Sequence, residues 1–428
     1  MYIERLHVKN IRLLAEQDFS FVNPDGSPRL WTVIVGENGV CKSTILQTIA
    51  LAAMGPKLGS ALVQDAQRLR NVNSPEAASI AAIFTPPDGR KRLVSSLRIE
   101  PDRFDLVAGE DGEGAYFLDN LRGHRRSEGF VAGYGVGRFL AEPGEAVLPR
   151  DPVVQRVRGL FNVRHKMLGL DFYNALRSPY LAKKFSQLLR EVLAQGGPGK
   201  QLLPGFCDLD LAPHKKFGLS PMLEPMFDAN VFELWVDDHS VQLPAAWLSD
   251  GYQATLSWIA DLLGYALLEM GDDADLQKLE GIVLLDEIDL HLHPTWQRQI
   301  VPVLRGVFPR LQFIVNTHSP LVLAGFEREE IILLKLQDGQ VVQDAAEIEP
   351  GVLTASEILT NFFDVQHAGR PDLVSKERRY LELRGLKRPS ASERKELEEL
   401  GKALDPYWAS GPTTAELLSP EEILKQKA

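Results

Sequence analysis

The pattern of apolar residues predicts a chain in which buried strands alternate with helices. Near the N-terminus, short apolar runs predict strands at residues 3–8, 19–21 and 31–35. The third run is continuously apolar, which is typical of a strand buried on both faces of a sheet. It leads through a glycine-containing loop into an apolar helix over residues 45–54. This alternation indicates an α/β fold with a mostly parallel central sheet.

The rest of the chain continues the alternation and then changes character. An antiparallel β part is predicted by short runs at 93–99, 104–107 and 130–134. Further on, the pattern predicts helices at 180–194, 250–270 and 295–307, strands at 231–236, 282–285 and 312–315, and a hairpin of 331–335 with 340–343. The last part reads as short charged helices at 355–363, 371–384 and 392–404.

Composition and charge narrow the class of protein. The 428 residues are 44% apolar and 25% charged, which excludes extended disorder. No apolar run reaches the roughly 18 residues of a membrane span. The first residues also lack the form of a secretory signal, so we expect a cytoplasmic protein with no membrane partner. The two cysteines, Cys41 and Cys207, exclude a disulfide framework.

Residues 36–44 match a phosphate-binding loop at all but one position. The pattern is Gly-x-x-x-x-Gly-Lys-[Ser/Thr], and Cys41 stands where its second glycine belongs. In such a loop, backbone N–H groups face the phosphates, the lysine neutralises their charge and the serine coordinates Mg²⁺. The predicted ATP contacts are Gly36, Asn38, Gly39, Cys41, Lys42, Ser43 and Thr44. The Cβ of Cys41 would crowd the phosphates, so altered nucleotide binding and a chance glycine-rich turn stay open as alternatives.

An apolar strand that ends in two carboxylates, Asp286 and Glu287, is the second element. Read as a Walker B motif, it places Asp286 on Mg²⁺ through its water shell and Glu287 against the attacking water. The alternative is a solvated strand end, because Asp-Glu after a strand is common. Combined with the Lys42 loop, the two carboxylates predict Mg²⁺-dependent ATP hydrolysis.

Ser249 and Gly251 open the predicted helix that precedes this strand. Their segment resembles the Leu-Ser-Gly-Gly-Gln signature of ATP-binding-cassette ATPases, which binds the γ-phosphate held by a second protomer. Asp250 departs from that signature. A plain helix N-cap is the alternative, since Ser and Asp are good caps.

His318 follows the predicted strand at 312–315, where cassette ATPases keep a switch histidine that contacts the γ-phosphate. The alternative is a structural histidine at a strand end. His291 and His293 lie between Walker B and His318, in the position of the D-loop that crosses a dimer interface. They could also suggest zinc, but a third close ligand is not apparent.

Taken together, residues 1 to about 345 resemble the cassette-type ATPase heads of the SMC, RecF and OLD-nuclease group. Within that group they resemble the compact ATPases of bacterial anti-phage systems such as Septu and ATPase-containing retrons. The likeness rests on residues 3–12, 286–294 and 316–320. It implies an α/β P-loop NTPase of the ABC-type head class, with a mostly parallel sheet, an antiparallel β part and a helical inserted lobe.

The same resemblance implies partners and a domain organisation. It implies a homodimer or higher homo-oligomer that sandwiches two ATP molecules, and closure that controls a separate nuclease or other effector acting on nucleic acid. We expect a head at 1–350 with an inserted mixed or helical lobe at about 60–230. Residues 351–428 are expected to form a helical, partner-contacting segment.

Several alternatives stay open. A transporter ATPase subunit shares the four motifs, but it keeps its signature much closer to Walker A than Leu248 lies to Ser43 here. A non-hydrolysing nucleotide-binding scaffold would explain Cys41, although Glu287 and His318 argue against it. Gln155 is our only suggestion for the Q-loop glutamine, and no motif supports it.

Nucleic acid is a further partner to consider. The net charge of −11 disfavours unspecific binding on average. Basic clusters nevertheless occur at 89–92, 122–126 and 156–166. They would form a phosphate-binding stripe if all three shared one face, whereas each alone reads as ordinary solvated surface.

Overall fold

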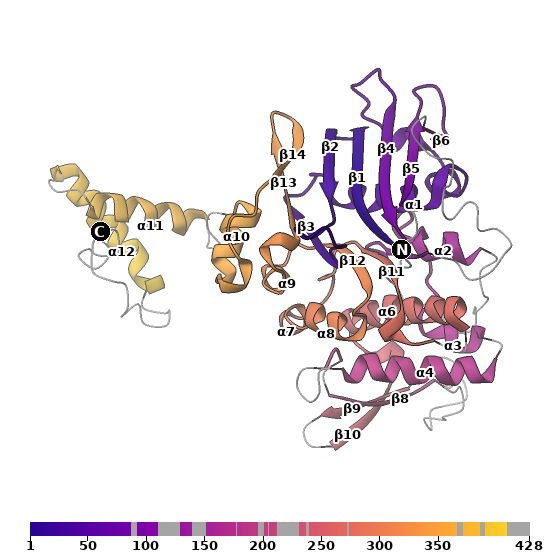
Figure 1. The fold of residues 1–428 in the computed structure, drawn as a ribbon. Coiled ribbons are helices and arrows are strands. Elements are labelled where there is room, and N and C mark those ends of the chain that lie inside the picture. Colours follow the sequence, from indigo (N-terminus) through magenta and orange to yellow (C-terminus); the bar gives the residue numbers. More distant parts are fainter. Residues whose placement is uncertain are drawn as a thin grey trace. The chain divides into compact units, whose positions relative to one another are not determined.

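A six-stranded sheet lies at the centre of the first of two units, Met1–Ile358 (Figure 1). The computed structural model describes residues 1–86, 92–109, 129–138, 151–176, 178–195, 201–203, 205–211, 231–236, 239–271, 274–365, 371–385 and 390–408. The sheet order is β14-β13-β3-β12-β11-β7, and the strands from β13 to β7 run parallel. These strands are β3 (Trp31–Gly36), β7 (Phe130–Tyr134), β11 (Gly281–Leu285), β12 (Leu311–Asn316), β13 (Ile331–Gln337) and β14 (Gln340–Asp344). The predicted α/β fold with a mostly parallel sheet is therefore confirmed.

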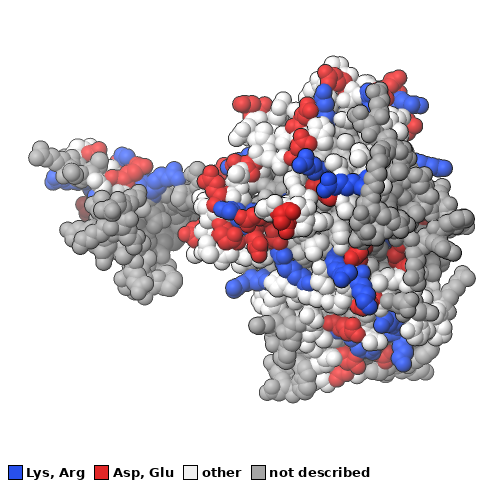
Figure 2. Space-filling view, in the orientation of Figure 1, with Lys and Arg blue, Asp and Glu red and all other residues white. Residues whose placement is uncertain are grey.

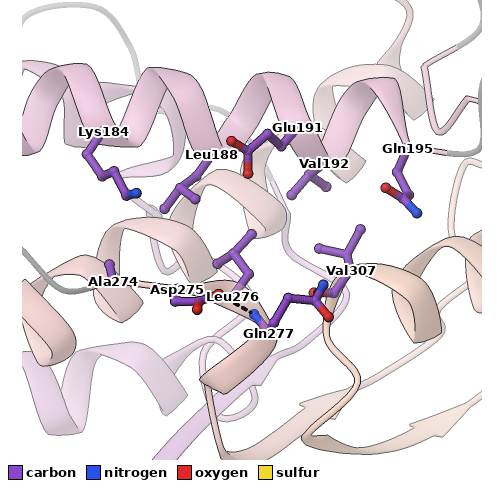
Figure 3. Close-up of a pocket in the computed structure, with 10 residues that line it drawn as sticks. All are labelled: Lys184, Leu188, Glu191, Val192, Gln195, Ala274, Asp275, Leu276, Gln277 and Val307. Atoms are coloured by element: carbon purple, nitrogen blue, oxygen red, sulfur yellow. Dashed lines mark hydrogen bonds between the residues drawn. The ribbon is translucent and has the colours of Figure 1, made fainter.

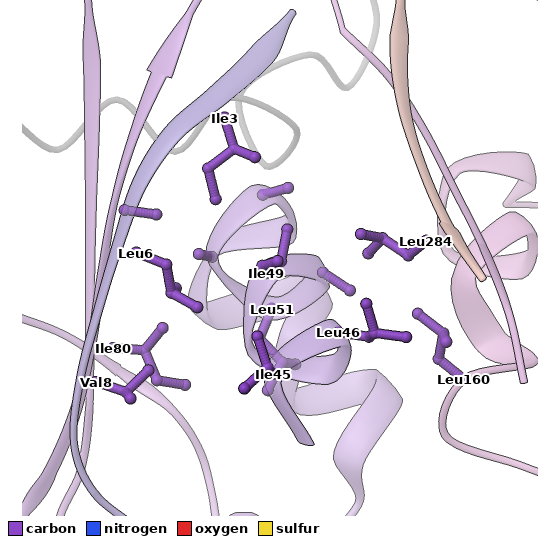
Figure 4. Close-up of a cluster of buried hydrophobic side chains, with 14 of the residues drawn as sticks. Ile3, Leu6, Val8, Ile45, Leu46, Ile49, Leu51, Ile80, Leu160 and Leu284 are labelled. Atoms are coloured by element: carbon purple, nitrogen blue, oxygen red, sulfur yellow. The ribbon is translucent and has the colours of Figure 1, made fainter. Parts of the chain in front are cut away.

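An antiparallel sheet faces the parallel one across the long helix α1 (Lys42–Val63). Its order is β2-β1-β4-β5-β6. The strands are β1 (Tyr2–Ile11), β2 (Leu14–Ser20), β4 (Ala78–Thr85), β5 (Leu93–Ile99) and β6 (Val107–Ala108). Figure 4 shows the side chains of Ile45, Leu46 and Ile49 on α1 between Leu6 of β1 and Leu284 of β11. All of these side chains are fully buried, so α1 is the centre of the hydrophobic core.

α1 extends well beyond the predicted stop at residue 54. The helix kinks at Gly55, where φ is 81°, and Pro56 starts the next turn. Among the described residues, α1 is the one helix long and apolar enough to cross a membrane by length and composition. However, 72% of the apolar 18-residue stretch within this helix is buried inside the fold. Its apolar character is explained by packing between two sheets.

Helices and a small sheet stack on the other face of the parallel sheet (Figure 1). The helix α6 (Asp250–Met270) packs on β7, and α4 (Pro179–Ala194) packs on α6. The antiparallel sheet β10-β9-β8 contacts α4 through β8. Its strands are β8 (Phe206–Asp210), β9 (Val231–Val236) and β10 (His239–Pro244). The predicted bounds of the helix at 250–270 are confirmed.

Short helices connect these layers. The α-helices of the first unit not yet named are α2 (Pro152–Arg158), α3 (Phe172–Ala175), α7 (Pro294–Gln297), α8 (Ile300–Val307) and α9 (Pro320–Leu323). The 3₁₀ turns are η1 (Ala66–Leu69), η3 (Gly169–Asp171), η4 (Ala245–Trp247), η6 (Leu276–Lys278), η7 (Arg328–Glu330) and η8 (Pro350–Val352). They are followed by α10 (Ala355–Phe363), whose predicted bounds are confirmed.

The second unit, Leu359–Ala428, contains α11 (Pro371–Arg384) and α12 (Ala391–Trp408). The two helices pack on each other. Arg379 of α11 donates two hydrogen bonds to Glu396 of α12, of 2.9 and 3.0 Å. A bidentate Arg–carboxylate pair of this kind fixes the relative orientation of two charged helices.

Three further sequence-based element predictions need correction. Residues 130–134 form a parallel strand of the central sheet, β7, because every residue of this run is buried. The run predicted at 104–107 contributes only β6, Val107–Ala108. The helix predicted at 295–307 is broken into α7 and α8, because Pro302 cannot donate to the carbonyl of Arg298 and its ring clashes there.

Candidate phosphate and magnesium site

The phosphate loop connects β3 to α1 at the carboxyl end of the parallel sheet. Lys42 is the first residue of α1, and its Nζ donates to the carbonyl oxygens of Gly36 at 2.8 Å and Glu37 at 2.7 Å. Burial lowers the pKa of Lys42 to about 8, while the carboxylates of Asp286 and Glu287 act in the opposite direction. The loop thus holds a buried ammonium group at the helix N-terminus, where the backbone dipole also favours an anion.

Cys41 keeps the backbone shape that a glycine would have at its position. Its φ is 64° and its ψ is 21°, in the left-handed region, and it caps α1 without a side-chain hydrogen bond. A non-glycine residue in this region costs roughly 1–2 kcal/mol. The left-handed conformation therefore places backbone strain in Cys41 itself.

Asp286 receives hydrogen bonds from two other elements. The hydroxyl of Ser43 donates to its Oδ1 at 2.8 Å, and the side-chain amide of Asn316 donates to the same oxygen. Ser43 belongs to α1 and Asn316 ends β12, so three segments far apart in sequence meet at this carboxylate. A hydroxyl and a carboxylate side by side are the oxygen donors that Mg²⁺ prefers.

Glu287 is held in an uncommon backbone conformation next to this carboxylate. Its φ is 51°, and its N–H donates to Oδ1 of Asn316 at 2.6 Å. Burial raises the pKa of Glu287, and the carboxylates of Asp286 and Asp289 raise it further. A raised pKa is the shift expected of a carboxylate that accepts a proton from water.

His318 lies at the same edge of the sheet, just after β12. Burial lowers the pKa of its imidazole, and the Lys42 ammonium lowers it further. The ring is therefore neutral near pH 7 and presents one donor and one acceptor nitrogen. The preceding residue, Thr317, donates to Asp289 Oδ1 at 2.5 Å and so links the strand end to the Walker B loop.

A cleft of about 290 Å³ brings these side chains together. Of the predicted residues, Asn38, Gly39, Cys41, Lys42, Ser43, Thr44, Asp286, Glu287 and His318 line it. Gly36 is not part of the lining, although its carbonyl oxygen accepts from Lys42. Ser249 and Gly251 are not part of it either. In one copy of the chain, the structure thus assembles the predicted loop, Walker B pair and histidine, but not the signature.

The signature residues begin α6, where they contact the segment after Walker B. Ser249 is the exposed N-cap of α6, and its side chain makes no capping hydrogen bond. A Cβ at Gly251 would lie 2.1 Å from the carbonyl oxygen of His291, so only glycine fits there. Next to it, the ring of Tyr252 packs edge-on against Trp296 of α7, with centroids 3.9 Å apart. The signature turn is therefore fixed against the D-loop region of the same chain.

Two other predicted features lie away from the cleft. Gln155 belongs to α2 and does not line the cleft, so nothing supports it as a Q-loop glutamine. His293 caps α7, where its Nδ1 accepts from the N–H of Thr295 at 3.4 Å.

The phosphate-binding stripe stays a prediction, because two of its three basic clusters fall largely outside the described residues. Residues 89–91 and 122–126 lie outside the described parts of the chain. Arg92 pairs with Glu4 at 2.9 Å. Arg156 is buried, pairs with Glu269 at 3.2 Å and lies over the ring of Phe130, so the prediction of a surface residue was wrong there. Figure 2 shows Lys and Arg interspersed with Asp and Glu over the described residues of the face in view.

A second cavity, of about 260 Å³, lies between α4 and the turn η6 (Figure 3). Lys184 and Glu191 of α4 face it from one side and Gln277 from the other. The Gln277 side chain donates to the carbonyl oxygen of Gly306 at 3.2 Å. This lining contains no glycine turn and no strand end with carboxylates, so the first cleft is the candidate phosphate site.

Comparison with known proteins gives the family. The family model described as "AAA domain, putative AbiEii toxin, Type IV TA system" matches residues 31–324, which run from β3 to α9. The chain belongs to this AAA-domain family. The matched range contains the phosphate loop, the signature, Walker B and His318.

Individual relatives agree with this assignment. The AAA-domain protein is 27% identical over 434 aligned positions to the Septu protein PtuA of Bacillus mycoides, covering 97% of this chain and 52% of that protein. It is 38% identical over 144 positions to the Retron Ec83 probable ATPase of Escherichia coli, covering 34% of this chain and 26% of that one. The chain thus spans about half the length of PtuA and a quarter of the retron ATPase. The predicted resemblance to Septu and retron ATPases is confirmed.

A solved structure identifies the fold class of this AAA domain. The crystal structure of an Smc head bound to the C-winged helix domain of ScpA superposes with a TM-score of 0.50 at 20% identity. The match covers 81% of this chain and 98% of that head. The fold is accordingly that of an SMC-type ATPase head, as predicted.

Two polar residues that line the AAA-domain cleft were not predicted as site residues from the sequence. Arg12 lines the cleft, and its Nη1 donates to the hydroxyl of Thr44 at 2.8 Å. Its φ of 48° turns the chain just after β1, and no sequence signal indicates this geometry. Asn316, which joins Asp286 to Glu287, could have been found, because it precedes the Thr317-His318 pair at the end of a buried strand.

Proposed function

We propose that the protein binds ATP and hydrolyses it with Mg²⁺, and that it works as an ATP-controlled switch. The observation that carries this proposal is the contact of Ser43 with Asp286, beside Glu287, in the cleft beneath the phosphate loop. An SMC-type head fold and membership of an AAA-domain family support ATP as the nucleotide.

Each side chain of the cleft has a role in this proposal. Lys42 and the N–H groups of the loop bind the β- and γ-phosphates, and Ser43 and Asp286 would hold Mg²⁺. The metal ion, when bound, supplies charge neutralisation on the phosphates. Glu287 orients the attacking water and accepts its proton. His318 hydrogen-bonds to the γ-phosphate.

We further propose that two copies close head to tail, so that Ser249 and Gly251 of each complete the site of the other. The exposed N-cap of α6 supports this, because Ser249 makes no capping hydrogen bond and does not line the cleft of its own chain. The packing of Gly251 against His291 supports it too, since it joins the signature to the segment after Walker B. Closure of the dimer would then depend on ATP, because each phosphate site is completed by the other copy.

The relatives suggest the biological setting. Septu PtuA and a retron ATPase are components of named defence systems, so we propose a role in anti-phage defence in the cytoplasm. The effector in this proposal is a separate nuclease or other protein acting on nucleic acid. Residues 1–350 would act as the head, and the charged helices of 351–428 would contact the partner.

A non-hydrolysing nucleotide-binding scaffold is the second candidate. Cys41 favours it, because a side chain lines the cleft where the loop pattern has glycine. The complete set of Asp286, Glu287 and His318 in that same cleft favours hydrolysis.

The experiment that decides is ATP hydrolysis by the full chain with and without Mg²⁺, beside Glu287→Gln. We expect turnover in the wild type, a loss of about hundredfold or more in the variant, and an ATP-bound dimer of the variant in light scattering. The exposed carboxylate Glu347 offers the matched control, Glu347→Gln, which should keep full turnover. ATP binding with no hydrolysis in any protein would establish the scaffold instead.

A further inference from the structure

A buried arginine lies behind the Walker B carboxylates. Arg138 follows β7, which runs parallel to β11 with Tyr134 opposite Leu285. The N–H of Asp286 donates to the carbonyl oxygen of Tyr134 at 2.8 Å, so the segment after β7 leaves the sheet next to the segment after β11. Arg138 is 3% exposed and is not part of the cleft lining.

The turn that carries Arg138 has little freedom to move. A Cβ at Gly135 would lie 2.2 Å from the carbonyl oxygen of Gly159, and one at Gly137 would lie 1.9 Å from that of Val163. Both glycines therefore let the turn pack directly on the backbone of residues 159–163. The N–H of Arg138 also donates to the carbonyl oxygen of Val136 at 3.1 Å. The guanidinium is thus placed by a turn that is itself fixed.

The guanidinium of Arg138 binds the backbone of both Walker B residues. Its Nη2 donates to the carbonyl oxygen of Asp286 and, at 3.0 Å, to that of Glu287, and its Nε donates to Gly135 at 2.9 Å. Burial lowers the pKa of Arg138 to about 10, and the carboxylates of Asp286, Asp289 and Glu287 act against that shift. The group stays a cation at neutral pH and partly balances the charge of the three carboxylates.

These bonds act on a residue in an unfavourable conformation. Glu287 has a φ of 51°, and for an L-residue the left-handed region costs roughly 1–2 kcal/mol. Asn316 holds the N–H of Glu287 and Arg138 holds its carbonyl oxygen. The peptide groups on both sides of Glu287 are therefore restrained, and the direction of its side chain into the cleft follows from them.

We propose that Arg138 is a positioning residue for ATP hydrolysis, which fixes the Asp286–Glu287 backbone so that the Glu287 carboxylate is aimed at the nucleotide. This inference rests on the hydrolysis proposed above. It requires that loss of Arg138 slows turnover and leaves ATP binding intact, because the phosphate contacts come from a different segment.

The test compares Arg138→Gln and Arg138→Lys in the full chain. We expect kcat to fall about tenfold to hundredfold in Arg138→Gln, with the ATP dissociation constant within about twofold of wild type. Arg138→Lys should recover part of the loss, since an ammonium keeps the charge but cannot bind three carbonyl oxygens in a planar array. In a Glu287→Gln background, Arg138→Gln should cause no further loss, because it acts through Glu287.

Arg156 supplies the matched control. It is also buried near β7, but its partners are Glu269 and the carbonyl oxygen of Gly129. Arg156→Gln should lower stability without changing kcat per folded molecule. If Arg138→Gln does not fold, Arg138→Lys is tested alone, and Arg156→Lys is then its control. Unchanged kcat in the Arg138 variants beside an active wild type and an inactive Glu287→Gln would overturn this inference and leave the proposed function standing. An inactive wild type would refute both.

Discussion

Replacement of Asn316 by alanine tests whether one buried amide holds the Walker B pair together. Asn316 is 1% exposed, donates to the Asp286 carboxylate and accepts from the N–H of Glu287 at 2.6 Å. A hydrogen bond to a charged group contributes about 1.5–3 kcal/mol and a neutral one about 1 kcal/mol. The Asn316→Ala variant should therefore lose about 3 kcal/mol of unfolding free energy.

The loss is measured by urea unfolding of the full chain, followed by tryptophan fluorescence. ATP turnover of the folded variant should also fall by about tenfold or more, because the Asp286 carboxylate and the Glu287 backbone each lose a restraint. Gln343→Ala is the control, since Gln343 is an exposed amide on β14 that donates to the carbonyl oxygen of Asp18. The control should stay within about 0.5 kcal/mol of wild type. A loss below about 1 kcal/mol with normal turnover in Asn316→Ala would refute the reasoning.

Three further predictions concern the loop, the signature and a buried acid. Cys41→Gly should keep or tighten ATP binding, measured by titration, and weaker binding would contradict this. Cys41→Val should destabilise the chain by about 1 kcal/mol or more, because a β-branched residue fits the left-handed region poorly. Gly251→Ala should lower the free energy of unfolding in urea by about 1–3 kcal/mol, because the added Cβ meets the His291 carbonyl oxygen. The same variant should lose ATP-dependent dimerisation, and an intact dimer would argue against the signature role. Burial raises the pKa of Asp261 from its usual 3.8 to about 7, so the folded state binds the extra proton and this contribution to stability falls as the pH rises from about 4 to 7. Thermal melts of Asp261→Asn should lack that part of the pH dependence, and identical profiles for both proteins would refute the assignment.

The sequence was sufficient to predict elements whose pattern of apolar residues is compatible with only one kind of structural environment. The continuous apolar run before the phosphate loop predicted β3, and the periodic run at 250–270 predicted α6 with its true ends. Phosphate and Mg²⁺ chemistry requires particular residue types at fixed spacing, and most of the residues predicted on that basis line one cleft.

The sequence was not sufficient where the neighbours of an element decide its role. The run at 130–134 is short and apolar, and only its place beside β11 makes it a parallel core strand. The role of Arg138 was missed for the same reason, because a basic residue after an antiparallel strand elsewhere in the fold is not expected beside Walker B. The long separation of the two segments in sequence hides their contact, which depends on sheet order.

The order of strands in the parallel sheet has a consequence for synthesis of the chain. β3, which ends at the phosphate loop, has β12 and β13 as its two neighbours, and both come near the end of the first unit. During translation, β3 and α1 leave the ribosome long before either neighbouring strand has been made. The emerging chain therefore carries the phosphate loop before either strand that flanks β3 in the parallel sheet has been made. We therefore expect the phosphate loop to reach its final surroundings only after residues 331–337 have been made.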